Sequence, residues 1–334
     1  MGGYFAAALA LLIAVLPAEA GVHHQDWLFL ARPYPIEAAP SFPGGLFHWI
    51  DSLAGTSGGK TVPAHRAEYL RLFGALAPED RAHLRAFLAA RAVQPSSAML
   101  GVFCRAATVE DALTAIRPDL ASEAWEGLAK ALAHFRPKYE IVWKSGAVPN
   151  AFLERVRRDR GRARLERLLA RVVGFYGVNP LGVAPPRLAL VPVPDGYGTH
   201  AEAIGDVLLL EIRKGEGLAD EASVVIHENA HFLWSLVPEE RRLRLAGFAE
   251  GLDDASAQAF RLFGEALPTA LGQGVADRSF RPLNWSLDGP WYHRQDVDRC
   301  AKRIYPVVRE ALDRGLTLDE GFVERALRAA ADRR

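Results

Sequence analysis

The stretch Val224-Val225-Ile226-His227-Glu228-Asn229-Ala230-His231-Phe232-Leu233-Trp234 decides the fold. Most of its residues are apolar and none is proline, so the pattern predicts a buried helix. On a helix, His227 and His231 leave the same face one turn apart, and their imidazoles can bind one metal ion. Glu228 projects from the neighbouring face, where its carboxylate can reach a metal-bound water as a general base without being a ligand.

This H-E-x-x-H run resembles the zinc-binding helix of the zincin metallopeptidases, which is also flanked by uncharged residues and free of proline. The resemblance covers roughly residues 185 to 310 and implies a zinc-dependent peptidase of the glutamate-ligand, gluzincin-like type. It implies that His227 and His231 hold Zn2+, that Glu228 is the catalytic base, and that the substrate is a peptide or protein.

Other interpretations of the motif remain open. A buried helix with two core histidines is one. A di-iron helix is another, because Glu228 and His231 also form Glu-x-x-His, but that fold needs a second such pair, which this sequence lacks. The sequence after His231 has no histidine at the metzincin spacing. Two further classes are a catalytically inactive zincin-like binding or scaffold protein and a secreted helical protein whose motif is coincidental.

In zincins that use a glutamate ligand, a second helix downstream supplies it, and the resemblance implies Glu265. On a helix from about Ala255, Glu265 shares a small, partly polar face with Gln258, Leu262, Thr269 and Gly272. Pro268 is expected to kink this helix one turn further on. The rival ligands are Glu250, Asp253 and Asp254.

The resemblance also implies that a C-terminal Tyr or His supports the oxyanion of the tetrahedral intermediate. Tyr292 and His293 are the candidates, and Asp296 or Asp298 could orient the imidazole. The alternative is a surface histidine beside a helix N-terminus.

Two strands are predicted before the metal helix, at Arg187 to Val193 and at Asp206 to Ile212. In zincins the strand shortly before the metal helix is commonly the sheet edge along which an extended substrate lies, and Asp206 to Ile212 has that place. An unpaired edge offers main-chain donors and acceptors to a peptide. A plain core strand is the alternative.

The composition is that of a globular protein, with 334 residues, 50% hydrophobic and 24% charged. Forty basic residues balance forty acidic ones, which gives no electrostatic reason to expect nucleic acid or an anionic membrane as partner. The apolar run from Tyr4 to Leu16, followed by Ala18-Glu19-Ala20, predicts a cleaved secretory signal over 1–20. The run is short for a bilayer span, so a secreted or periplasmic protein without a membrane span is expected.

The expected fold class is α+β and predominantly α-helical, with an N-terminal arm and helical domain over 21–150 and a zincin-like domain over 151–334. An irregular arm is predicted from Gly21 to about Gly59. The helical patterns that follow lie between Ala64 and Arg91, from Val109 to Ile116 and from Ser122 to Phe135. His65 and His83 read as surface residues.

Near the domain boundary, a short strand is predicted at Tyr139 to Trp143. One long charged helix is then expected from Pro149 to Tyr176.

The two cysteines, Cys104 and Cys300, have no second Cys or His at ligand spacing. In an oxidising compartment they could form one disulfide, and two separate buried thiols are the alternative. Export would favour the disulfide.

Overall fold

The computed structural model describes residues 34–55, 61–93, 96–145, 147–178, 184–195 and 200–331. The predicted secretory signal over 1–20 lies outside them. None of the described helices combines the length and the apolar character that crossing a bilayer requires.

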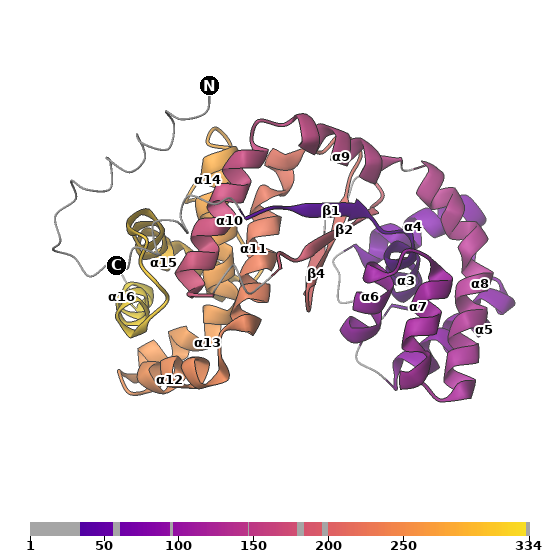
Figure 1. The fold of residues 1–334 in the computed structure, drawn as a ribbon, viewed down its shortest axis with the longest axis horizontal. Coiled ribbons are helices and arrows are strands. Elements are labelled where there is room, and N and C mark those ends of the chain that lie inside the picture. The colour runs from indigo at the N-terminus through magenta and orange to yellow at the C-terminus, as the bar shows by residue number, and fades with distance from the viewer. Residues whose placement is uncertain are drawn as a thin grey trace, which may run out of the picture.

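The described residues contain one four-stranded sheet in the order β1-β2-β4-β3 (Figure 1). β1 (Glu37–Pro40) and β4 (Val207–Ile212) both pair in parallel with β2 (Arg187–Pro192). β3 (Ala201–Ile204) returns antiparallel beside β4 and forms one edge of the sheet. β2 and β4 are almost entirely buried, which explains their continuous run of Leu, Val, Ile and Ala.

Helices from the first half of the chain pack together beside one face of the sheet (Figure 1). Apolar side chains from that face, including Val191 and Leu209, belong to the same core as Phe47 and Trp49. The elements are α3 (Phe42–Ala54), α4 (Val62–Phe73), α5 (Pro78–Arg91), α6 (Ser96–Arg105), α7 (Val109–Ile116), the short η1 (Arg117–Asp119) and α8 (Ser122–Ser145).

Helices from the second half cover the other face. Leu190 and Leu208, which alternate along the strands with the residues of the first core, belong to this second core. The elements are α9 (Val148–Arg158), α10 (Arg162–Tyr176), α11 (Leu218–Leu236), α12 (Glu239–Glu250), α13 (Asp254–Thr269), the π-helix η2 (Ala270–Ala276), α14 (Asp277–Phe280), α15 (Gln295–Arg314) and α16 (Glu320–Ala331). The fold is α+β and predominantly helical.

The described part of the predicted irregular arm is mostly the buried helix α3. The Ser41 side chain accepts a hydrogen bond from Gly44 N, which caps the first turn. Glycine at positions 44 and 45 reflects close packing, because an added Cβ would lie 2.6 Å from Cys104 Sγ and 2.0 Å from Tyr139 Oη respectively. The prediction of an irregular arm was wrong for these residues.

Two other local predictions were wrong. Tyr139 and Trp143 lie within the long helix α8, so no strand forms there. The charged segment after Pro149 forms two helices, α9 and α10, because the chain leaves the helical conformation at Asp159, whose side chain accepts a hydrogen bond from Gly161 N at 2.6 Å.

The cysteines are two free, buried thiols. Cys104 lies on α6 in the first core, and Cys300 lies on α15 in the second. The disulfide prediction was therefore wrong. Burial raises the pKa of Cys104 to about 12 and that of Cys300 to about 11, so both stay protonated and unreactive at neutral pH.

Glu221, in the first turn of α11, makes stability depend on pH. It is buried, and burial together with the Glu216 carboxylate raises the pKa of Glu221 to about 9. The unfolded chain loses the Glu221 proton near the ordinary carboxyl pKa, while the folded chain keeps it up to about pH 9, so the free energy of unfolding falls as the pH rises between these two pKa values.

Replacement of Glu221 by Gln, which stays neutral at every pH, tests this dependence. Glu221→Gln should unfold at nearly the parent temperature at about pH 5 and at a higher temperature than the parent at about pH 8.5. Thermal unfolding checks this, with exposed Glu240→Gln as the control; parallel curves for Glu221→Gln and the parent would contradict it.

Candidate metal centre and cleft

Three of the predicted site residues converge between α11 and α13. His227 Nε2 and His231 Nε2 each lie 3.6 Å from Glu265 Oε2, and the two ring nitrogens are 3.1 Å apart. In a tetrahedral zinc site with ligands at about 2.0–2.1 Å, neighbouring ligand atoms are separated by about 3.3 Å. The three atoms are therefore spaced as a metal ion would require.

Close helix packing positions this group. At Gly272 of η2, an added Cβ would lie 2.5 Å from Ser223 O and 3.1 Å from His227 Cβ, so only glycine permits this approach to α11. Pro268 does not end α13, and the predicted disturbance takes the form of a change to a π-helix from Ala270 onward. Glu265 lies before this change and stays on the face toward α11.

The charges within the group stabilise one another. The His227 and His231 imidazoles, each 3.6 Å from Glu265 Oε2, together with the hydrogen bond from Tyr292 hold the pKa of Glu265 well below its ordinary value. Burial alone would lower the pKa of His231, but the Glu265 carboxylate, 3.6 Å away, and the nearby Glu228 carboxylate raise it. A carboxylate that is ionised at neutral pH and faces two imidazoles is a suitable donor set for a divalent cation.

Glu228 lies beside these residues without belonging to the ligand group. Its Oε2 accepts a hydrogen bond of 3.1 Å from Ala203 N on β3. Burial raises the pKa of Glu228, opposed by His227, His231 and His200. A raised pKa brings a carboxylate closer to the range in which it can accept and return a proton.

β3 is the strand at the cleft, which corrects the prediction for Asp206 to Ile212. β4 has neighbours on both sides, β2 and β3, so it has no free edge. In an antiparallel pair, the main-chain N–H and C=O groups of successive residues point alternately toward the partner strand and away from it. His200 O points toward β4, because it accepts a hydrogen bond from Glu211 N. The main-chain groups of Ala201 and Ala203 therefore point away from β4, toward the open side of the edge strand. The length and position of a short edge strand depend on this pairing, which local sequence does not determine.

Tyr292 lies at the metal group, and its hydroxyl donates a 2.9 Å hydrogen bond to Glu265 Oε2. Its ring stacks with that of His227, with centroids 6.1 Å apart. Asp298 Oδ1 fixes the segment by accepting from Trp291 N at 2.6 Å and Tyr292 N at 3.0 Å. Burial, together with the bond to Glu265, raises the pKa of Tyr292, so its hydroxyl stays protonated at neutral pH.

His293 is exposed at the wall of the cleft. The carboxylates predicted to orient its imidazole have other partners. Asp296 pairs with Arg294, and Asp298 holds main-chain N–H groups and Lys302. That predicted orientation was wrong.

These residues line a cleft of about 920 Å³. Sequence reasoning missed four polar or aromatic lining residues, which come from three separate segments: His200, Glu202, Gln273 and Trp291. No motif marks them, and the only available signal was that His200 and Glu202 precede a predicted strand.

The rival ligands are placed elsewhere, because neither Glu250 nor Asp254 lines the cleft and Asp253 caps α13 by accepting from Ser256 N.

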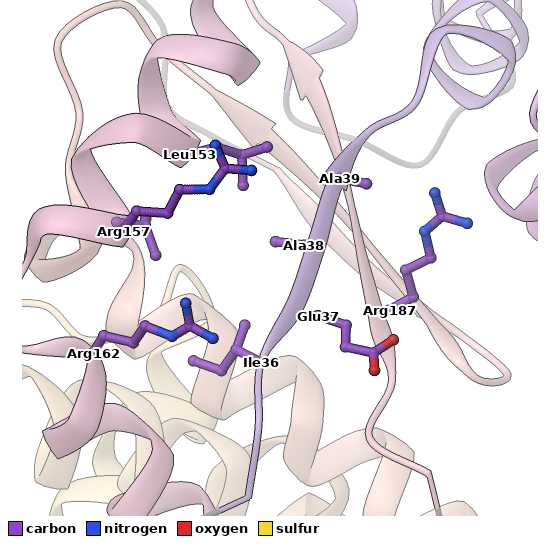
Figure 2. A pocket seen from close by; sticks show the side chains of 9 residues that line it. Ile36, Glu37, Ala38, Ala39, Leu153, Arg157, Arg162 and Arg187 are labelled. Atoms are coloured by element: carbon purple, nitrogen blue, oxygen red, sulfur yellow. The ribbon is translucent and has the colours of Figure 1, made fainter.

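A second hollow, of about 370 Å³, runs along β1 at the opposite edge of the sheet (Figure 2). Arg157 and Arg162 lie on one side of the strand, and Glu37 and Arg187 lie on the other. Both of the former arginines pair with glutamates of their own helices. None of its lining residues is a histidine, cysteine or serine, so this hollow has no equivalent of the metal group.

Comparison of the chain with models of known protein families, with curated protein sequences and with solved structures finds no match.

Glu265→Gln tests the third ligand. Loss of a charged donor should lower zinc affinity at least tenfold, or by more than about 1.4 kcal/mol, because even changes in the residues behind metal ligands commonly cost that much. Competition with a chromophoric chelator measures the affinity. Glu250→Gln, an exposed rival on α12, is the matched control and should bind zinc as the parent does; release of zinc by the Glu250 variant alone would show that Glu265 is not the ligand.

Proposed function

We propose that the chain is a zinc-dependent peptidase of the gluzincin-like type. The observation that carries the proposal is the convergence of His227, His231 and Glu265 within 3.6 Å at the wall of the cleft, with Glu228 beside them. Two imidazoles and one carboxylate with an open position facing a cleft form a catalytic type of zinc site. Zinc bound there would supply Lewis acidity and an activated water.

The protein's own residues supply the remaining requirements. Glu228 accepts the proton of the attacking water and returns it to the leaving amine. Ala203 N holds one oxygen of Glu228, which leaves the other free for this exchange. The Tyr292 hydroxyl, already a hydrogen-bond donor at the metal group, supports the developing oxyanion.

An extended peptide is the substrate that the cleft fits best. The open-side main-chain groups of β3, apart from Ala203 N, which donates to Glu228, can pair with such a chain irrespective of its side chains. None of the described lining residues is Lys or Arg, so a substrate's C-terminal carboxylate would find no cationic partner there. These features favour binding of an internal peptide segment over recognition of a C-terminus.

Glu228→Gln separates a peptidase from a metal-binding scaffold. Gln keeps the shape and can still accept from Ala203 N, but it cannot take a proton. Zinc should stay bound at one equivalent in the cleft while peptide hydrolysis falls by about 10²–10⁴-fold. Single-turnover cleavage of a peptide library together with metal analysis measures both quantities. Equal cleavage by variant and parent would overturn the mechanism, and a zinc-loaded parent that cleaves nothing would favour the scaffold.

Tyr292→Phe tests the oxyanion role. The variant keeps the stacking on His227 and loses only the hydroxyl, so kcat should fall by about 10²-fold, as for other lost oxyanion donors, with KM little changed. Steady-state kinetics checks this. His293→Ala, at the exposed wall of the cleft, is the control and should stay within a few-fold of the parent; the reverse ranking would assign the role to His293.

A further inference from the structure

A second group of metal-ligand type lies in the buried interior, against the first core. Glu211 Oε1 on β4 faces His48 Nε2 of α3 at 2.9 Å and His65 Nε2 of α4 at 2.8 Å. Thr61 Oγ1, directly before α4, donates to the same oxygen at 2.9 Å. The remaining oxygen, Oε2, accepts from His200 N at 3.0 Å. Residues far apart in the sequence thus converge on one carboxylate.

The burial of this group is nearly complete. Glu211 is 0% exposed, and His48 and His65 are each 2% exposed. Removing a carboxylate from water costs several kcal/mol unless charges and hydrogen bonds compensate it. Glu211 is also the single polar residue in the strand sequence VLLLEI, where an apolar side chain would satisfy packing. Burial alone would raise the pKa of Glu211, but hydrogen bonds from His48 and His65 hold it well below its ordinary value.

Glu211 Oε1 faces one more potential hydrogen-bond donor than it can accept from. A carboxylate oxygen has two lone pairs, and Oε1 faces three potential donors, Thr61 Oγ1, His48 Nε2 and His65 Nε2. A cation between the two rings and the carboxylate would resolve this surplus. Both imidazoles would then offer Nε2 lone pairs to the cation, and the threonine hydroxyl would keep its hydrogen bond.

The donor set matches that of the cleft. Each group has two imidazole Nε2 atoms and one carboxylate oxygen within metal-binding reach of one another. The groups differ in access, because the cleft group borders a cavity of about 920 Å³ and the Glu211 group is enclosed. Catalytic zinc sites keep an open position, whereas structural sites are closed.

We propose that His48, His65 and Glu211 form a second, structural site for zinc or a similar divalent transition metal. The present N···O separations are hydrogen-bond lengths, and replacement of the ring protons by an ion would widen them toward about 3.3 Å. Imidazole nitrogen with one carboxylate suits zinc better than calcium or magnesium, which prefer all-oxygen sites.

The site would fasten the first-half helices to the sheet beside the cleft. α3 and α4 each contribute one histidine, and β4 contributes the carboxylate. Glu211 also holds His200 through its side chain and its backbone N–H, and His200 immediately precedes the edge strand β3. The His200 ring stacks on His48, with centroids 5.9 Å apart. Loss of the metal should therefore loosen the substrate-binding edge without removing any ligand of the cleft.

Metal counting tests this inference independently of peptidase activity. The full chain is loaded with zinc, dialysed against metal-free buffer and measured by inductively coupled plasma mass spectrometry. The parent should hold two zinc ions, and the double variant His227→Ala/His231→Ala should keep one. His48→Ala/His65→Ala should also keep one and should unfold at a lower temperature. His83→Gln alters the partly exposed Glu79–His83–His134 group, whose donor atoms also lie within reach of one metal ion, and it should keep two; loss of one ion in this variant would place the second ion there instead.

Each outcome decides the question. Zinc-free protein after loss of His227 and His231 overturns the second site, even if the His48/His65 variant fails to fold. One ion in the parent that survives both the loss of His227 and His231 and the His83→Gln change, and that is lost with His48 and His65, supports the buried site and removes the proposed zinc centre in the cleft. No ion in the parent overturns both.

Discussion

Gly272 brings the backbone of η2 so close to α11 that even a methyl group would lie 2.5 Å from Ser223 O, shorter than any ordinary contact. This contact fixes the register of two helices that carry the metal group. His231 lies two turns after Ser223 and Glu265 lies two turns before Gly272, so the two segments cross with these side chains opposed. A larger residue at 272 would separate the ligands by separating the helices.

The sheet packs against α11 and sets the position of the metal group on that side. Alternating side chains of β2 and β4 enter two different cores, so both faces are covered by helices and only the edges remain open. At one edge β3 turns back antiparallel and brings Ala203 N to Glu228. In the proposed peptidase, the strand that holds the general base is also the strand that would pair with the peptide, so the binding edge and the chemistry would be coupled.

Local periodicity was sufficient to predict the parts of the fold that depend on one segment. His227 and His231 share a face because they are four residues apart, and the small face around Glu265 indicated a close helix neighbour. The predominantly helical α+β class followed from the same patterns. The helix α3 was missed because its segment is rich in Pro, Gly and aromatic residues and shows no helical period, whereas Gly44 and Gly45 serve contacts with residues at positions 104 and 139.

Features that depend on distant partners could not be predicted locally. His65 has the sequence context of a surface residue, yet it is buried because Glu211, 146 positions away, accepts its hydrogen bond. The identity of the edge strand likewise follows from which strands pair. The same limit applies to the His227–His231–Glu265 and His48–His65–Glu211 groups, since their donor atoms are alike and only enclosure by the fold distinguishes them. With a cleft beside it, such a group can exchange water and substrate; enclosed by helices and sheet, it can only hold the elements together.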